Sequence, residues 1–200
     1  MAVVSGGTTL IDNGTLDAGV STGSLILLST QTASASASLE FTSGIDSTYD
    51  SYVFKFISIH PATDNVNFNF NMSTDGGSNY NVTKTTTWFR AEHYENDTGT
   101  GLSYDGGRDL AQGTGDQTLA YRIGNDNDQT TSGELILYNP SSTTFVKHFI
   151  AKFNDVLNID ISQNSFIAGY GNTTSAVNAI KFVMSSGNID DGIIKMYGVK

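Results

Sequence analysis

The segment VNFNFNMSTDGGSNYNV at residues 66–82 constrains the fold most strongly, because its apolar and amide residues alternate. Four apolar residues from Val66 to Met72 occupy every second position, and asparagine fills the three positions between them. An alternation with a period of two predicts a β-strand that has one apolar side. Asp75, Gly76 and Gly77 then predict a turn in which the glycines take positive φ.

The free energies of burial favour one register for this strand. Burying the four apolar side chains is worth about 1.5–3 kcal/mol for each of them. A slip by one residue would bury asparagines instead, and each unpaired amide would cost about 1–3 kcal/mol. Phe68 and Phe70 are therefore expected to face the core, and Asn67 and Asn69 to face water. The alternative is that the asparagines face a neighbouring subunit or a glycan.

Similar strand patterns, separated by turn residues, recur along the rest of the chain. Charged residues make up only 15% of the chain and few residues favour helices, whereas Thr, Val, Phe and Tyr favour strands. The expected strands are 24–31, 36–42, 51–60, 65–73, 79–94, 117–123, 132–139, 143–154, 164–170, 176–185 and 192–199. This spacing predicts an all-β fold, a single jelly-roll-like antiparallel β-sandwich over residues 24–200.

Three regions depart from the strand pattern. Residues 95–131 predict a long surface loop that holds one weak strand. Helical turns are expected only within 154–163 or 172–180. Residues 1–23 fit neither period and predict an extended N-terminal arm that docks on a partner, or alternatively a frayed terminus. The apolar residues expected to make that docking contact are Val3, Val4, Leu10, Ile11 and Leu16.

The bulk composition narrows the function classes. A net charge of −10 repels phosphate backbones, so nucleic-acid binding is not expected. The absence of cysteine excludes disulfides, thiolate metal sites and thiol nucleophiles. No apolar run reaches the roughly 18 residues of a membrane span, and the N-terminus lacks the pattern of a signal peptide.

No motif predicts catalysis, and we expect no catalytic residues and no enzyme activity. His148 shares a strand side with Val146 and Ile150 and is expected to be partly buried. Asp126 and Asp128 place carboxylates at alternate positions, as in the start of a calcium loop, although its glycine and distal glutamate are missing. A structural Ca²⁺ at these two residues is the only cofactor that the sequence suggests.

One segment has the residue types that recognise sugars. TTTWFRAEHYEND at residues 85–97 contains Trp88, Arg90, His93 and Tyr94, which combine flat aromatic rings with hydrogen-bonding groups. By strand parity Trp88, Arg90 and Tyr94 share one side. These four residues predict a glycan-binding site, and the alternative is that Trp88 anchors the core.

Three blocks of the sequence resemble β-sandwich domains of tailed-phage virion proteins. AVNAIKFVMSSGNIDDGIIKMYGVK at residues 176–200 is similar to their closing hairpin. EFTSGIDSTYDSYVFKFISIHPATDNVNFNFNMSTDGGSNY at 40–80 resembles their core segment, and GELILYNPSSTTFVKHF at 133–149 resembles their middle hairpin. Together the blocks cover about 80 residues and imply a relation over 25–200.

The resemblance implies a structural protein without enzyme activity on the virion surface. Such domains occur as capsid decorations, head fibres and tail-fibre tips, often as trimers. The expected partners are other virion proteins of the capsid, tail or neck, and the protein would be made in the host cytoplasm. The alternative is a carbohydrate-binding adhesin, a receptor-binding tail-fibre module that recognises host surface glycans.

Overall fold

The described part of the protein is built from β-strands. The structure, a computed structural model, describes residues 3–5, 8–12, 15–16 and 24–199, and these form fifteen strands in three sheets. All strand pairs are antiparallel, and the described residues contain no helix. In this part of the chain there is accordingly no helix that could cross a membrane.

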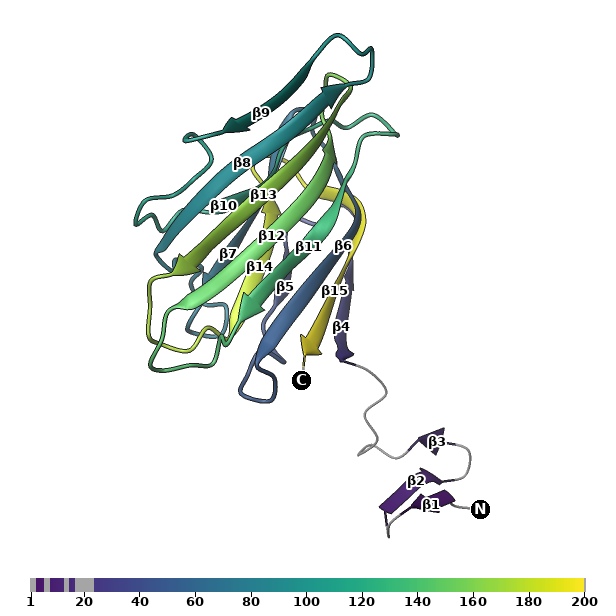
Figure 1. Ribbon diagram of the computed structural model, residues 1–200, viewed down its shortest axis with the longest axis vertical. Helices are drawn as coiled ribbons and strands as arrows, with labels where there is room; N and C mark the ends of the chain where they lie inside the picture. The colour runs from purple at the N-terminus through teal and green to yellow at the C-terminus, as the bar shows by residue number, and fades with distance from the viewer. Residues whose placement is uncertain (1–2, 6–7, 13–14, 17–23, 200) are drawn as a thin grey trace.

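The N-terminal segment forms a small sheet of its own. Its strands are β1 (Val3–Ser5), β2 (Thr8–Asp12) and β3 (Thr15–Leu16), paired in that order. In Figure 1 this sheet lies beyond the end of the sandwich at which β4 begins. The described residues of this segment thus pair as short antiparallel strands, which the prediction of an extended arm over residues 1–23 did not include.

The larger sheet of the sandwich has eight strands. In sheet order these are β4 (Leu25–Thr32), β15 (Ile189–Val199), β6 (Ser51–Pro61), β11 (Thr131–Tyr138), β12 (Lys147–Val156), β13 (Ile161–Gly171), β8 (Lys84–Tyr94) and β9 (Thr100–Tyr104). The middle of this sheet is a meander, because β11 pairs with β12 and β12 pairs with β13. The register does not shift between β12 and β13.

The smaller sheet has four strands, which are, in order, β10 (Gln117–Ile123), β7 (Val66–Ser73), β14 (Ala179–Met184) and β5 (Leu39–Phe41). It lies against one side of the larger sheet (Figure 1). The predicted all-β antiparallel sandwich is therefore confirmed. The jelly-roll connectivity stays a prediction, and the sheets of eight and four strands differ in size more than the two sheets of an eight-stranded jelly roll.

Aromatic rings from both sheets fill the space between the layers. Phe182 on β14 meets Phe56 of β6 edge-on at 4.9 Å between ring centroids, and it stacks with Phe68 at 6.0 Å. Phe70 meets Phe149 of β12 edge-on at 5.0 Å. Such pairs add about 0.5–1.5 kcal/mol to the burial of their surface. The register expected for residues 66–73 is confirmed, because Phe68 and Phe70 are fully buried in the core.

The other side of β7 differs from the prediction. Asn69 and Asn71 were expected to face water, yet they are 8% and 1% exposed. The Asn71 side chain donates hydrogen bonds to the Thr114 carbonyl and to Asp116, so the segment before β10 covers it. Parity correctly separates the two sides of the strand, but it does not show that a distant segment covers the second side.

Residues 95–131 hold two strands instead of one. The strand at 117–123 was predicted and is β10, whereas β9 at Thr100–Tyr104 was missed because its residues do not alternate clearly. The two regions expected to allow helical turns, 154–163 and 172–180, instead contain strand ends and the loops between strands. The turn after β7 is confirmed, with φ of 71° at Gly76 and 92° at Gly77.

A buried polar cluster lies on the core side of β12 and β13. Asp155 is fully buried and accepts hydrogen bonds from Thr131 Oγ1 (2.5 Å), Ser165 Oγ (2.7 Å) and Gln163 Nε2 (3.1 Å). Burial raises the pKa of Asp155 to about 6, because the charged form is poorly solvated there. The hydrogen bonds oppose this shift and keep the carboxyl group satisfied.

Candidate functional site

Trp88, the central residue of the predicted glycan site, lies in the core. It is fully buried, and its ring meets Tyr121 of β10 edge-on at 6.3 Å between centroids. A buried indole cannot stack on a sugar ring, so the prediction of sugar binding by Trp88 was wrong. The alternative of a core anchor is correct, because β10 and the smaller sheet cover this side of β8.

The other three predicted residues do not form one surface. Arg90 points to the same side as Trp88 and makes ion pairs with Glu92 (Nε to Oε2, 3.0 Å) and Asp105 (3.1 Å). Tyr94 is half-buried beside the turn into β9, and a side chain at Gly99 would contact its ring. His93 faces the opposite side, where it meets the exposed Asp97 at 3.1 Å. Strand parity therefore predicted correctly which side of β8 each side chain faces. The side chains do not share an accessible surface on which one ligand could contact them all.

Arg90 instead belongs to a cluster around Tyr121. The Arg108 guanidinium lies over the Tyr121 ring at 4.0 Å, and Arg90 and Arg122 lie at 5.8 Å and 5.9 Å. A cation over an aromatic face contributes about 0.5–2 kcal/mol. These contacts cover the end of the core next to Trp88. The face of the Tyr121 ring that Arg108 covers is not accessible to a ligand.

The predicted calcium site gathers no ligand set. Asp126 and Asp128 are exposed in the loop after β10. The Asp126 carbonyl lies 3.3 Å from His60 Nε2, and Asp128 lines a shallow groove that also contains His60 and Asp190. Across the described part of the chain, no group of three or more histidine or acidic side chains is placed to hold a metal ion. Calcium needs six to eight oxygen ligands, so the geometry does not support this site.

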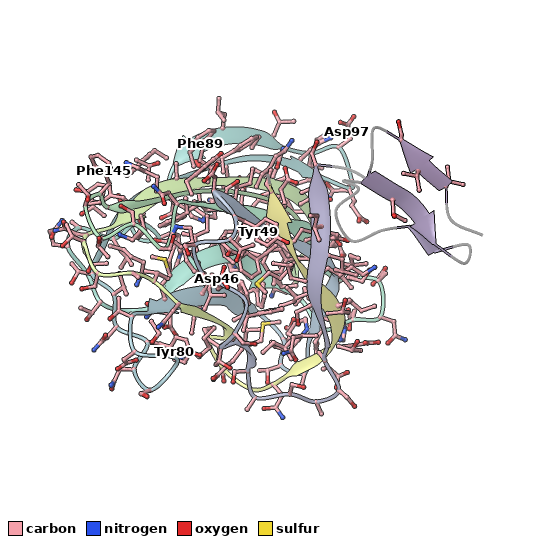
Figure 2. The ribbon with its side chains drawn as sticks, turned by 90° about the horizontal axis from the view of Figure 1, so that it is seen from below. Asp46, Tyr49, Tyr80, Phe89, Asp97 and Phe145 are labelled. Atoms are coloured by element: carbon pink, nitrogen blue, oxygen red, sulfur yellow. The ribbon has the colours of Figure 1, made fainter. Side chains whose placement is uncertain are left out.

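The outer side of the larger sheet is the most distinctive free surface. Figure 2 shows Phe89 on this outer side, whereas Tyr49 lies between the layers. Phe89 stacks on Phe166 of β13 at 4.8 Å with nearly parallel rings, and Lys152 lies over Phe166 at 5.6 Å. The exposed large apolar side chains on the sheet are Leu25, Leu27, Ile57, Phe89, Leu102, Tyr104, Tyr138 and Ile150. Exposed apolar side chains that gather on one side of a sheet mark an interaction surface in many proteins.

A groove on this surface combines rings with hydroxyl groups. We call it the tyrosine groove, and its polar and aromatic lining includes Thr85, Thr87, Tyr138, His148 and Tyr170. The His148 and Tyr170 rings lie 6.0 Å apart. Ile150 and Ala168 form its apolar floor and also line the neighbouring hollow beside Phe89, so the two depressions are continuous.

The tyrosine groove was missed because His148 was assigned to the wrong side of its strand. His148 and Ile150 are exposed, while Phe149, Ala151 and Phe153 face the core. Two phenylalanines and an alanine bury more apolar surface than the alternative side would. The stronger apolar alternation at 149, 151 and 153 was the signal that would have placed His148 outside.

The predicted contact residues of the N-terminal segment are described in part. Val3 and Val4 are 52% and 56% exposed on β1. The backbones of Leu10, Ile11 and Leu16 lie in β2 and β3, but their side chains lie outside the described residues, as do residues 17–23 before the sandwich.

Comparison with known proteins gives no relative. No protein-family model matches the chain, and no curated protein and no solved structure matches it. Its function is therefore inferred from its own residues and geometry.

Proposed function

We propose that this chain is a structural protein of a tailed-phage virion, without enzyme activity, exposed on the particle surface. It would serve as a capsid decoration, a head-fibre subunit or a fibre tip, in contact with other virion proteins and as a homo-oligomer, with a trimer favoured. The observation that carries the proposal is the separate N-terminal sheet, on which Val3 and Val4 are exposed. This sheet lies beyond one end of the sandwich (Figure 1). The sequence blocks that resemble phage virion domains support it.

The sandwich has a complete core without the N-terminal sheet. The buried core cluster contains residues from Ala33 onward and includes none from the described part of 1–23. Exposed valines on a short strand gain free energy when a partner covers them, at roughly 25 cal/mol per Å² of apolar surface. A sheet that the sandwich does not need for its own core is therefore suited to docking on the particle.

Deletion of residues 1–23 tests the proposal. We expect the truncated protein to remain folded and soluble and to be absent from purified particles. The double substitution Val3→Asp and Val4→Asp should weaken incorporation in the full chain, and Ser5→Asp on the same strand is the matched control, which keeps incorporation. Incorporation of the truncated protein at full occupancy would show that the segment does not dock.

The number of copies per particle separates the structural roles. Hundreds of copies on a stained gel indicate a capsid decoration, whereas a handful to a few dozen indicate a tail or neck position. This measurement needs only purified particles and the intact chain.

A second candidate function is glycan binding, which the tyrosine groove favours. Its two tyrosine rings supply flat surfaces for sugar stacking, and threonine hydroxyls and an imidazole lie beside them. A small number of polar groups that point into a mostly apolar depression is typical of sites that bind small ligands. The chain would then be a carbohydrate-binding adhesin that recognises host surface glycans.

A glycan array with wild-type protein tests this function. We expect saturable binding that Tyr170→Ala and Tyr138→Ala each abolish without loss of folding. Tyr104→Ala, an exposed tyrosine of β9 that does not line the groove, is the matched control and should bind normally. An array without hits at high protein concentration would remove the adhesin from consideration.

A further inference from the structure

A buried lysine and a buried asparagine meet where the two sheets of the sandwich come together. Lys84 begins β8 of the larger sheet, and Asn71 lies on β7 of the smaller sheet. Both residues are buried, at 0% and 1% exposure, and Lys84 Nζ lies 2.6 Å from Asn71 Oδ1. A primary amine and a carboxamide are thus in contact away from bulk water.

The Asn71 carboxamide is held at both ends. Its Oδ1 accepts a second hydrogen bond from the Met72 backbone N–H at 2.9 Å. Its Nδ2 donates to Asp116 Oδ1 at 2.9 Å and to the Thr114 carbonyl at 3.0 Å. A donor on the amide oxygen stabilises the charge that forms there when a nucleophile adds, as in an oxyanion hole. A carboxylate on the amide nitrogen is placed to deliver a proton to it as it leaves.

The Lys84 amine is easier to deprotonate than an ordinary lysine. Burial lowers the pKa of Lys84 to about 8, because the ammonium is poorly solvated, and Asp116 partly opposes this. About a tenth of the amine is then neutral at pH 7. The described residues include no carboxylate in ion-pair contact with Lys84, whose other partner is the Val82 carbonyl at 2.7 Å. Loss of the buried charge therefore relieves a cost of folding.

We propose that Lys84 and Asn71 condense into an intramolecular amide bond, with Asp116 as the catalytic acid and base. The neutral amine, formed by loss of one proton to solvent, adds to Cγ of Asn71, and a bond forms between Nζ and Cγ. In this adduct Nζ and Nδ2 are bonded to the same carbon, so Asp116, which contacts Nδ2, can take a proton from Nζ and pass it to Nδ2. The bond between Cγ and Nδ2 then breaks and ammonia leaves, so no oxidant or other reagent is required.

The fold holds the amine and the carboxamide together, so the reaction is expected to be much faster in the folded protein than between the same groups in separate peptides. Nζ already contacts one atom of the carboxamide and needs only to shift to the adjacent carbon. Holding two reacting groups in this way is equivalent to a very high effective concentration. The product would join the two sheets covalently in a chain that contains no cysteine for a disulfide.

The mass of the intact wild-type chain tests the proposal directly. We expect the purified, denatured protein to be lighter by one ammonia than its sequence requires. A mass that matches the unmodified sequence overturns the proposal. Since a succinimide at another asparagine would lose the same mass, the position of the change is then established by digestion.

Trypsin gives a specific signature because Asn71 and Lys84 lie in one tryptic peptide. An acylated Lys84 is no longer cationic and is not cleaved, so we expect a peptide of residues 56–90 that is lighter by one ammonia, in place of 56–84. A further cut before Asp75 lies between the linked residues and should leave two pieces that stay joined. Free pieces after this cut would overturn the link.

Variants assign the roles of the three side chains. Lys84→Met and Asn71→Ser should both retain the unmodified mass. Lys147→Met is the matched control: Lys147 is equally buried, but its Nζ contacts only the carbonyls of Phe145 and Thr173, so the variant should keep the link. Asp116→Ala should form the link at least tenfold more slowly in a time course after refolding. An undiminished rate would refute the role of Asp116.

Discussion

The buried carboxyl group of Asp155 leads to a prediction about stability and pH. Burial raises its pKa in the folded protein from 3.8 to about 6. A group that binds its proton more tightly in the folded state stabilises the fold when it is protonated. This contribution is fully present below pH 3.8 and is lost as the pH rises through about 6.

The size of the effect follows from the two pKa values. Their difference is worth about 3 kcal/mol when the group passes from fully ionised to fully protonated. Between about pH 7 and about pH 5 the expected gain in the free energy of unfolding is about 1.4 kcal/mol. The carboxylates with lowered pKa values, Asp46 and Asp75, act in the opposite direction only at lower pH.

Urea unfolding at the two pH values measures this gain. Part of any change comes from the net charge of −10, whose self-repulsion also decreases as carboxylates take up protons. Asp155→Asn retains that general effect and lacks the titrating group, so the difference between wild type and variant isolates Asp155. We expect the wild type to gain about 1.4 kcal/mol more than the variant.

Equal gains in the two proteins would show that burial does not raise the pKa of Asp155. A substitution at a fully buried position can also prevent folding, because an amide nitrogen would replace one acceptor oxygen among donors from Gln163 and Ser165. Titration of the wild-type carboxyl by carbon NMR avoids this difficulty. A midpoint near 4 in that titration would contradict the same reasoning.

Four further substitutions test packing and one surface ion pair by urea unfolding. Trp88→Ala should cost about 3–5 kcal/mol, as expected for a large core residue, and an effect below 1 kcal/mol would contradict its burial. Gly133→Ala should lower the free energy of unfolding by about 1–3 kcal/mol, because the added carbon would lie 2.3 Å from the Lys152 carbonyl oxygen. Its control is Gly106→Ala, where the added carbon would have no atom within 4 Å and the change should stay within about 0.5 kcal/mol. Lys55→Met should change stability by less than about 1 kcal/mol, since its 2.6 Å ion pair with Glu134 is exposed to solvent.

The sequence predicts the strands well because their signals are local. Eleven expected strands correspond to strands of the sandwich, and the alternation at 66–73 correctly places Phe68 and Phe70 in the core. The small N-terminal sheet was also predictable, since the Gly-Gly and Asn-Gly pairs at 6–7 and 13–14 of the sequence are typical hairpin signals. β9 carries no comparable pattern, because its glycine and serine residues do not define an apolar side.

The candidate site was harder to predict because it depends on contacts between distant segments. Parity shows that Trp88, Arg90 and Tyr94 share a side, but only the pairing of β10 with β7 places Tyr121 against Trp88. His148 could have been placed outside by comparing the two sides of its strand. The tyrosine groove could not, since its residues come from β8, β11, β12 and β13.

The segment between β9 and β10 explains why a sequence rich in amides and hydroxyls suits this sandwich. The segment continues along the edge of β8, where Lys84 pairs with Gly113 and the Thr86 N–H donates to the Leu110 carbonyl, before it enters the smaller sheet as β10. A loop that crosses between layers brings backbone groups that need partners.

Short polar side chains supply those partners. Thr86 Oγ1 accepts from the Leu110 N–H, and Gln117 Nε2 donates to the Arg108 carbonyl. Before any link to Lys84 forms, Asn71 donates to the Thr114 carbonyl. An apolar residue at any of these positions would leave a backbone group unpaired at a cost of about 1–3 kcal/mol. The alternating amide residues of β7 have a pattern that is typical of a strand side facing solvent. In this sandwich, amide side chains are instead required on the covered side of β7 and at the start of β10, where the two sheets meet.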